Sequence, residues 1–275
     1  MTTLAQQLTT HARDGALDRG PVALVIAEDD GALSETIGHL IRLGFPAILV
    51  ALPDGLEVET TSDAILTLRA RTAGPGAVAT LVGEVMRSLP AKTWFHYCFN
   101  GEFLFYPHAE TRRVSEVLDF HASERRRALP TTVVDLYTED LATHADGIDL
   151  VAPAFDRTGY FAEGDTIRGG LRWRFEDDIP PAERQISRFS LVRSDPALRL
   201  GEDHRWSDED LNALSCPWHR NLTGAIASFR AAKALAASPE RRDRIGTFAW
   251  AGSERFDWTS KHLLDAGFME IGQWF

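Results

Sequence analysis

The feature that most constrains this 275-residue chain is a strand–helix–strand pattern near its start. The segment "PVALVIAEDD" (21–30) is a continuous apolar run that ends in three acids, which is typical of a buried parallel strand emerging at the edge of a sheet. Apolar residues then recur at helical spacing up to Gly44, a residue type at which helices commonly end. "PAILVAL" (46–52) is the next predicted strand and is closed by a Pro-Asp-Gly turn. Together these features predict a βαβ unit.

The rest of the chain continues this alternation. Further strands are predicted at 93–99, 102–107 and 131–137. Further helices are predicted from residue 77, at 114–127 and at 221–237, whereas 63–70 fits either a strand or a short helix. The pattern predicts an α/β protein with an open, mostly parallel sheet flanked by helices, which binds its ligands at the carboxyl ends of the strands.

Nothing in the sequence marks a domain boundary, since it has no internal repeat, low-complexity segment or evident linker. We therefore expect one domain over residues 1–275. Its expected parts are an N-terminal helix or tail (1–20), a Rossmann-like half (21–107), an irregular half (108–220), and a C-terminal helix and tail (221–275).

Charge and composition narrow the classes of partner. The net charge of −11 argues against nonspecific binding to nucleic acid and against docking on an anionic membrane. No apolar run approaches the ~20 residues that a transmembrane helix needs, and the N-terminus lacks the features of a secretory signal. Cys98 and Cys216 form no CxxC pair, which is typical of free thiols in a reducing compartment. We expect a cytoplasmic protein with no nucleic-acid partner and no transmembrane segment.

Acidic residues follow three of the predicted strands. They are Glu28, Asp29 and Asp30 after the first strand, Asp54 after the second, and Glu102 after the strand at 93–99. Because the carboxyl ends of parallel strands meet at one edge, we expect these carboxylates to lie close together, where they could bind ribose hydroxyls or a divalent cation. The alternatives are helix capping and turn formation for the aspartates, and an incidental hairpin position for Glu102.

Several common catalytic motifs are missing from the sequence. It has no GxxxxGK[ST], no GxGxxG after the first strand, and no GxSxG, HExxH or paired CxxC. This removes the commonest ATPase, dehydrogenase, hydrolase and zinc-site interpretations.

Six segments occur in a distinctive order. "VALVIAEDDGALSETIGHLIRLGF" and "AILVALPD" are followed by "NGEFLFYP", then by "RGGLRWRF", and finally by "ISRFSLVR" with "RLGEDHRW". This order, over roughly residues 21–220, resembles the family 2 glycosyltransferases of the GT-A type. "GEFL" matches the end of their D-x-D-E-F-L motif, and "RGGLRWRF" is similar to their Gly-Gly-x-Arg-x-Arg segment. The resemblance implies a GT-A-like fold in which 21–107 binds a nucleotide-sugar donor and 108–220 binds the acceptor.

The chain departs from that family at the metal-binding motif. Where the family has Asp-x-Asp before Glu-Phe-Leu, this sequence has Phe99-Asn100-Gly101. The resemblance then leaves three alternatives open: a divalent cation, Mn²⁺ or Mg²⁺, held weakly by Glu102 and His204; arginine side chains in its place; or an inactive protein.

The resemblance also suggests roles for other residues. Nucleotide or diphosphate binding is expected from Glu28, Asp29, Asp54, Arg172, Arg174 and Arg193. The base that takes the acceptor's proton is expected to be Asp177 or Asp178.

The resulting prediction is a glycosyltransferase that moves a sugar from a nucleotide-sugar donor to a glycan or lipid-linked acceptor. Its expected place is the cytoplasm, peripheral to the inner membrane, in bacterial envelope or capsule polysaccharide synthesis. The alternatives are a non-catalytic relative that binds a nucleotide or a protein, and an unrelated α/β phosphate-ester hydrolase that uses Asp29 and Asp54.

Overall fold

The structure, a computed structural model, describes residues 3–157, 161–165, 170–173, 187–212 and 222–274. Its strands are β1 (Val22–Ile26), β2 (Ala47–Leu52), β3 (Ile65–Arg69), β4 (Trp94–Phe99), β5 (Glu102–Phe105), β6 (Ala128–Tyr137), β7 (Ala154–Asp156), β8 (Phe161–Asp165), β9 (Gly170–Trp173), β10 (Ser187–Arg193), β11 (Gly224–Ser228) and β12 (Ser253–Arg255). Its helices are α1 (Leu4–Arg13), α2 (Leu33–Leu43), α3 (Ala77–Ser88), α4 (Val114–Ser123), α5 (Arg230–Ala236), α6 (Pro239–Ile245) and α7 (Ser260–Asp265), with short 3₁₀ turns at Leu17–Arg19 and Glu209–Leu211.

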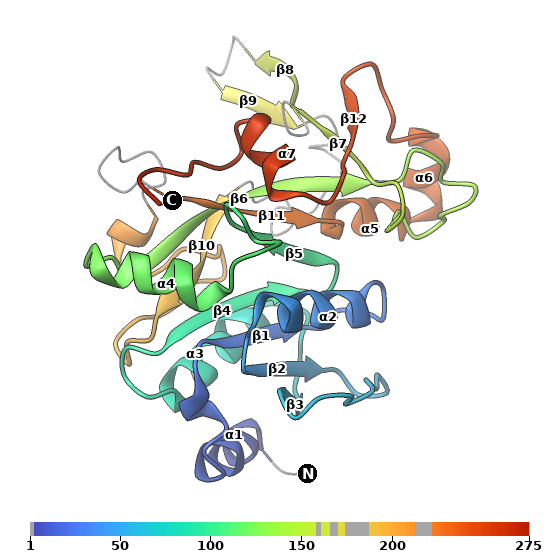
Figure 1. Cartoon of the computed structure of the whole chain (residues 1–275). Helices are drawn as coiled ribbons and strands as arrows, with labels where there is room; N and C mark the ends of the chain where they lie inside the picture. The colour runs from blue at the N-terminus through green and yellow to red at the C-terminus, as the bar shows by residue number, and fades with distance from the viewer. Residues whose placement is uncertain (1–2, 158–160, 166–169, 174–186, 213–221, 275) are drawn as a thin grey trace.

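The protein is an α/β protein with a large mixed sheet flanked by helices, which confirms the predicted fold class (Figure 1). Within the described residues, one sheet follows the order β12-β7-β6-β10-β4-β1-β2-β3, and β11 pairs with both β5 and β6. β8 and β9 form a separate two-stranded sheet. The single-domain assignment and its subdivision stay predictions.

The N-terminal part of the sheet is parallel, as the βαβ pattern predicts. β1 pairs in parallel with β2 on one side and β4 on the other, and β2 pairs in parallel with β3. All of Val22–Ile26 is buried, and α2 ends at Gly44, whose φ of 91° suits glycine. The chain winds outward from β1 to β3 and then returns through α3 to β4. The switch point of the topology, where open α/β sheets bind ligands, therefore lies between β1 and β4.

The C-terminal part of the sheet is mixed. β10 is antiparallel to both β4 and β6, while β11 is parallel to β6 and antiparallel to β5. β4 pairs with β1 and β10 but not with β5, so the Asn100-Gly101 corner is not a hairpin turn. It is the point at which the chain leaves one ladder of the sheet and enters another.

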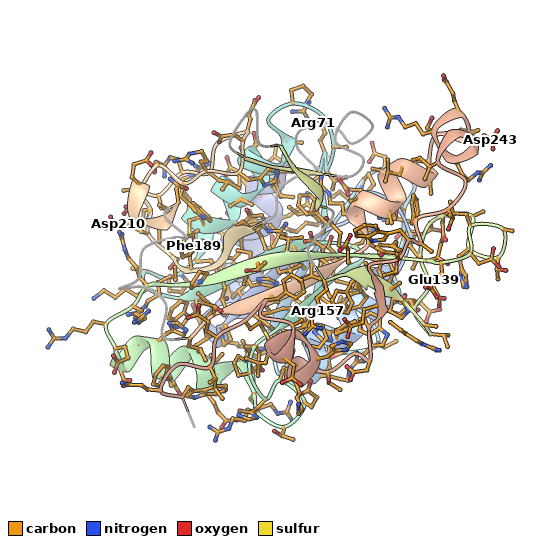
Figure 2. The ribbon with its side chains drawn as sticks, turned by 90° about the horizontal axis from the view of Figure 1, so that it is seen from above. Arg71, Glu139, Arg157, Phe189, Asp210 and Asp243 are labelled. Atoms are coloured by element: carbon orange, nitrogen blue, oxygen red, sulfur yellow. The ribbon has the colours of Figure 1, made fainter. Side chains whose placement is uncertain are left out.

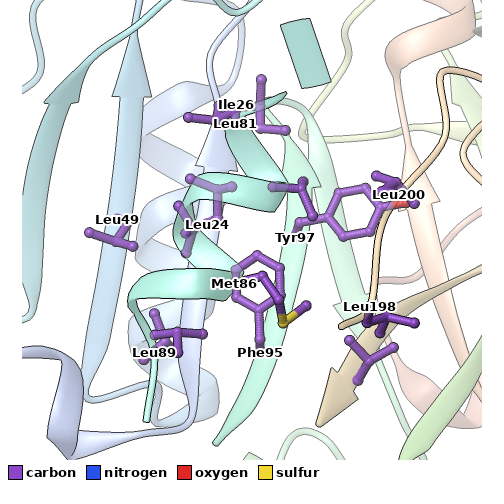
Figure 3. Packing of buried hydrophobic residues seen from close by; sticks show 14 of the residues in the cluster. Leu24, Ile26, Leu49, Leu81, Met86, Leu89, Phe95, Tyr97, Leu198 and Leu200 are labelled. Atoms are coloured by element: carbon purple, nitrogen blue, oxygen red, sulfur yellow. The ribbon is translucent and has the colours of Figure 1, made fainter. Parts of the chain in front are cut away.

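Helices cover both faces of the parallel strands. Side chains of α1 and α3 pack on the face that carries Leu24, Tyr97 and their neighbours, and α2 and α4 pack on the opposite face. Figure 3 shows the first of these layers, in which Leu81 and Met86 of α3 lie against Leu24 and Phe95. The two layers hold the strands so that their carboxyl ends form one fixed edge.

One predicted element is wrong. The segment 221–237, predicted as a single helix, contains β11 and only then the short α5. The apolar run "GAIAS" (Gly224–Ser228) has one β-branched residue, so its sequence favours a helix over a strand. The tertiary structure overrides this preference, because the segment fills the gap between β5 and β6 and every residue of β11 is buried. The ambiguous segment 63–70 contains strand β3.

Candidate functional site

A cavity of about 640 Å³ lies at the carboxyl ends of β1, β2 and β3. We call it the edge pocket. Its lining includes Gln7, Glu28, Asp54, Arg69, Arg71 and Thr72. Glu28 and Asp54 were both predicted from their positions after strands, and the structure brings them to one pocket. The volume falls in the range of roughly 300–1,000 Å³ that is usual for small-molecule sites.

Two arginines shape the outer side of the edge pocket. Arg69 donates to the carbonyl of Pro53 (3.1 Å) and pairs with Glu57, which fixes the turn that carries Asp54. Arg71 is exposed on the segment that leads to α3 (Figure 2). Its Nη2 donates to the carbonyl of Pro75 (2.8 Å), which orients the guanidinium. The guanidinium favours an anion on this side of the pocket.

Glu28 is held in place at the inner side of the pocket. Its carboxylate makes a two-point ion pair with Arg230, with N–O distances of 2.7 and 2.9 Å. The Arg230 guanidinium also lies over the Phe99 ring, 3.6 Å from its centroid. Glu28 is only half-buried, so it faces the cavity while Arg230 compensates its charge.

Asn100 joins the loop after β1 to the end of β4. Its Oδ1 accepts from the Glu28 backbone amide (2.8 Å), and its Nδ2 donates to Asp29 (2.6 Å) and to the Gly31 carbonyl (2.8 Å). Asp29 also pairs with Lys233 of α5 at 2.8 Å. A polar network therefore spans the switch point. It engages the side-chain amide of Asn100 and one carboxylate oxygen, Oδ1, of Asp29.

Glu102 is buried and committed to protein partners. Its carboxylate binds the guanidinium of Arg188 at two points and also accepts from the Phe99 amide (2.9 Å) and the Ser228 hydroxyl (3.3 Å). Burial alone would raise the pKa of Glu102, but the charge and hydrogen bonds of Arg188 and the Phe99 amide outweigh it. The pKa of Glu102 therefore lies below its usual value. Glu102 is charged at neutral pH, and Arg188 neutralises it.

A second carboxyl lies beside this ion pair. In the sheet, Ser228 stands opposite Glu102 on one side and Asp135 on the other. Asp135 is 5% exposed, and within the described residues its carboxyl has no hydrogen-bond partner. Burial, and then the charge of Glu102, raise its pKa well above the usual value. We call Glu102, Asp135, Arg188 and Ser228 the buried cluster.

His204 lies against β4, the strand that precedes Glu102. Its ring stacks on Tyr97 (6.3 Å between centroids) and meets Phe99 edge-on, the two rings over which the Arg188 guanidinium also lies. Burial, followed by the charges of Arg188 and Arg230, lowers the pKa of His204 to about 4. His204 is therefore neutral at pH 7, and its buried Nδ1 has no hydrogen-bond partner in the described part of the chain.

These residues do not fit a divalent cation as they stand. The Arg188 guanidinium occupies the carboxylate of Glu102, and His204 would add only one nitrogen ligand. Across the described residues, no three His, Cys, Asp or Glu side chains are grouped so that they could hold a metal ion. A cation at Glu102 would have to displace Arg188, so a metal there stays a prediction.

The remaining predicted site residues lie away from the edge pocket or outside the described part of the chain. Arg193 lies opposite Trp94, the first residue of β4, and thus at the edge away from Glu102. The physical reason is direction: β10 is antiparallel to β4, so the first residues of β10, with Arg188, reach the carboxyl edge. Arg172 is in β9, but its side chain lies outside the described residues, as do Arg174, Asp177 and Asp178.

Sequence reasoning missed Arg188, Asp135, Arg71 and Arg230. Asp135 lies inside a predicted strand and Arg188 in the partly apolar segment "ISRFSLVR", and a charged residue in an apolar run is itself a signal of a buried pair or a site. Arg230 could not be identified in this way because the strand before it, β11, was predicted as part of a helix.

Comparison of the sequence with protein-family models gave no match, and comparison with curated proteins gave no significant match. Among the helices in the described ranges, none has the length and apolar character required to cross a membrane.

Proposed function

We propose that this chain is a glycosyltransferase that moves a sugar from a nucleotide-sugar donor to a glycan or lipid-linked acceptor. The observation that carries the proposal is the edge pocket, which lies at the carboxyl ends of three parallel strands and combines carboxylates with Arg71. A nucleoside diphosphate presents the complementary groups, since its ribose and base carry donors and its diphosphate carries negative charge. The order of sequence motifs that resembles family 2 glycosyltransferases supplies the reaction class.

Each side of the pocket suits one part of the donor. Asp54 is exposed at the end of β2 and can accept hydrogen bonds from ribose hydroxyls or a base N–H. Arg71 suits the diphosphate, whose charge grows as the bond to the sugar breaks. Arg172 and Arg174 stay predicted contributors to this charge compensation, whereas Arg193 lies at the other edge of the sheet.

The proton acceptor for the incoming hydroxyl stays predicted as Asp177 or Asp178. In this proposal the enzyme works in the cytoplasm at the surface of the inner membrane.

A thermal-shift screen tests donor binding. Uridine, guanosine, cytidine and thymidine diphosphates and their sugars would each be added with Mn²⁺, Mg²⁺ or EDTA. A ligand at about 100 times its Kd stabilises the native state by about 2.7 kcal/mol, which gives a clear rise in Tm. We expect a rise with one nucleotide class that is reduced in Arg71→Ala and Asp54→Asn. Arg87→Ala, which removes an exposed arginine at the other end of α3, should leave the rise unchanged.

The EDTA arm decides between the two sources of positive charge. A rise that persists in EDTA supports arginine-based diphosphate binding, and a rise that needs Mn²⁺ or Mg²⁺ supports a metal that displaces Arg188. No rise with any nucleotide would contradict the proposal.

One observation favours a second function, that of a non-catalytic relative that binds the nucleotide without transferring the sugar. Glu102, the one acid left at the metal-binding motif, is fully engaged by Arg188. Release of nucleoside diphosphate from the sugar donor that binds, measured with and without added acceptor glycans, separates the two functions. Binding without any release would favour the second.

A further inference from the structure

A second pocket lies on the face of the sheet that α2 covers. It has a volume of about 470 Å³ and lies between α2, β5 and the segment before α7. Its walls include the rings of Phe103, Phe105 and Trp258, and we call it the aromatic pocket. It shares no lining residue with the edge pocket, so the proposed donor site does not explain it.

Trp258 forms a wall that is fixed before any ligand arrives. Its ring meets Phe103 edge-on at 4.9 Å between centroids, and its Nε1 donates to the Leu150 carbonyl (3.1 Å). Its backbone has a φ of 61°, a left-handed conformation that costs a bulky residue roughly 1–3 kcal/mol. The surrounding structure therefore holds this ring in place against a local preference.

The segment around Trp258 is tied down from both sides. Asp257 accepts from the amide (2.9 Å) and the hydroxyl (2.6 Å) of Thr259. The Ser260 hydroxyl donates to Glu110 (2.7 Å) and accepts from the His108 amide (3.1 Å). A site whose walls are already ordered loses less conformational entropy when a ligand binds.

A polar stripe along α2 forms the adjoining wall, and its His39 ring contacts Phe103 (5.5 Å between centroids) and Phe105 (5.3 Å). Glu35, His39 and Arg42 are spaced by four and three residues, so they lie on one side of the helix, and all three line the pocket. The Nε2 of His39 donates to the Leu104 carbonyl (2.7 Å). Burial, opposed in part by this bond, lowers the pKa of His39 to about 4. His39 is thus neutral at pH 7, and its Nδ1 is a hydrogen-bond acceptor.

The stripe therefore presents an acceptor-only carboxylate, an acceptor nitrogen and a donor-only guanidinium along one wall, next to the aromatic rings. Arg42 would repel a cationic ligand, whereas Glu35 and Glu110, which also lines the pocket, would repel an anionic ligand. A neutral ligand whose polar groups both donate and accept satisfies all three, and hydroxyl groups have this property. The faces of aromatic rings carry partial negative charge and pack well against the polarised C–H groups on one face of a sugar ring.

We infer that the aromatic pocket binds the ring of a neutral sugar, with its apolar face on the aromatic wall and its hydroxyls on the stripe of α2. The site is separate from the donor site and does not depend on the transfer reaction. Either proposal can therefore fail without the other.

The test is an NMR titration of the whole chain with methyl glycosides of glucose, galactose, mannose, rhamnose and N-acetylglucosamine. The indole N–H signal of Trp258 is identified as the one that Trp258→Phe lacks. We expect at least one glycoside to shift this signal with a Kd on the order of 1 mM. Glu35→Ala and Arg42→Ala, both at exposed positions, should each weaken binding about fivefold to tenfold without unfolding the protein.

Matched controls separate this site from its surroundings and from the edge pocket. Ser34→Ala changes an exposed residue of α2 that does not line the pocket, and Arg71→Ala changes the edge pocket, so neither should alter glycoside binding. The inference is overturned if no glycoside shifts the Trp258 signal at tens of millimolar. It is equally overturned if indole-3-acetate or tetramethylammonium binds this site more tightly than every glycoside.

Discussion

The edge pocket and the buried cluster lie along the same edge of one sheet, and each contains a glutamate bound at two points by an arginine. The Glu28–Arg230 pair borders a cavity and keeps side-chain exposures of 22% and 12%. The Glu102–Arg188 pair lies where β5, β10 and β11 converge, and its exposures are 1% and 4%. The same residue types thus have different surroundings: at the pocket they border a cavity, whereas in the cluster they are committed to the fold. Burial, more than residue type, decides which acid is available.

The largest effect should come from breaking the buried pair. Arg188→Met leaves the Glu102 charge without compensation, and such changes cost about 3–5 kcal/mol. Urea denaturation measures the loss. Adding Glu102→Gln removes the stranded charge, keeps one acceptor oxygen for the Phe99 amide, and should restore much of the stability.

Arg193→Met is the matched control for this change, because it alters the other end of the same strand. Arg193 is partly exposed and donates to the Lys92 carbonyl, so its loss should cost about 1 kcal/mol or less. If Arg188→Met and Arg193→Met lose the same free energy of unfolding, burial does not make the Glu102–Arg188 pair more important for stability.

The second effect depends on pH. The native pKa of Asp135 is raised above its unfolded value of about 3.9, so the folded protein binds the extra proton between these two values. The stability contributed by this proton is full below about pH 4 and is lost as pH rises to the native pKa. Asn cannot ionise, so Asp135→Asn should gain stability relative to the wild type through this window, by up to about 1.4 kcal/mol per pH unit.

Urea denaturation from about pH 4 to pH 8 measures this difference. Asp119→Asn, at an exposed position on α4, serves as the control and should run parallel to the wild type. If the difference in the free energy of unfolding between Asp135→Asn and the wild type does not change with pH, the pKa of Asp135 is not raised in the folded protein.

A smaller effect is expected at the half-buried pair. Glu28→Gln keeps the shape of the side chain and removes one charge, and solvent screening limits the loss of stability to about 1 kcal/mol. Thermal denaturation at low and at high salt is the measurement, with a smaller difference between the two proteins expected at high salt. If Glu28→Gln loses as much stability as Arg188→Met, the half-buried and the buried ion pair contribute equally to stability and the comparison is wrong.

The smallest effect on stability should occur within the edge pocket. Asp54→Asn and Arg71→Ala change exposed side chains, so the free energy of unfolding should stay within about 0.5 kcal/mol of the wild type. Nucleotide affinity should nevertheless fall about tenfold, equivalent to about 1.4 kcal/mol. Calorimetric titration with the nucleotide found by the screen checks this, and unchanged affinity in both variants would remove the edge pocket as the donor site.

Much of the parallel half of the fold could be predicted from the sequence, because its signals are local. The apolar run before Glu28 and the periodic helix that ends at Gly44 identify β1 and α2 without further information. The same logic predicted that Glu28 and Asp54 lie at one edge of the sheet, and both line the edge pocket. Strand β11 was missed because its conformation depends on two distant strands that enclose it.

The candidate site was harder to predict because the local sequence does not determine the direction in which a strand enters the sheet. The segment "ISRFSLVR" has an arginine near each end, and the prediction chose Arg193. The antiparallel pairing of β10 with β4 and β6 brings Arg188 to the carboxyl edge instead. Long-range pairing likewise creates the contact among Glu102, Ser228 and Asp135, since β5, β6 and β11 are far apart in the chain.

The Asn100-Gly101 corner determines how readily Asn100 undergoes spontaneous deamidation. Asn-Gly sequences deamidate when the glycine backbone nitrogen attacks the carbonyl carbon of the asparagine side chain, which closes a succinimide ring and releases ammonia. Here the Gly101 N–H donates to the Thr36 hydroxyl (2.9 Å), and the Asn100 amide is held by Glu28, Asp29 and Gly31. The attack therefore requires this corner to open first. Slow conversion of Asn100 to aspartate, followed by mass spectrometry over weeks of storage, would act as a clock for local opening at the centre of the sheet edge.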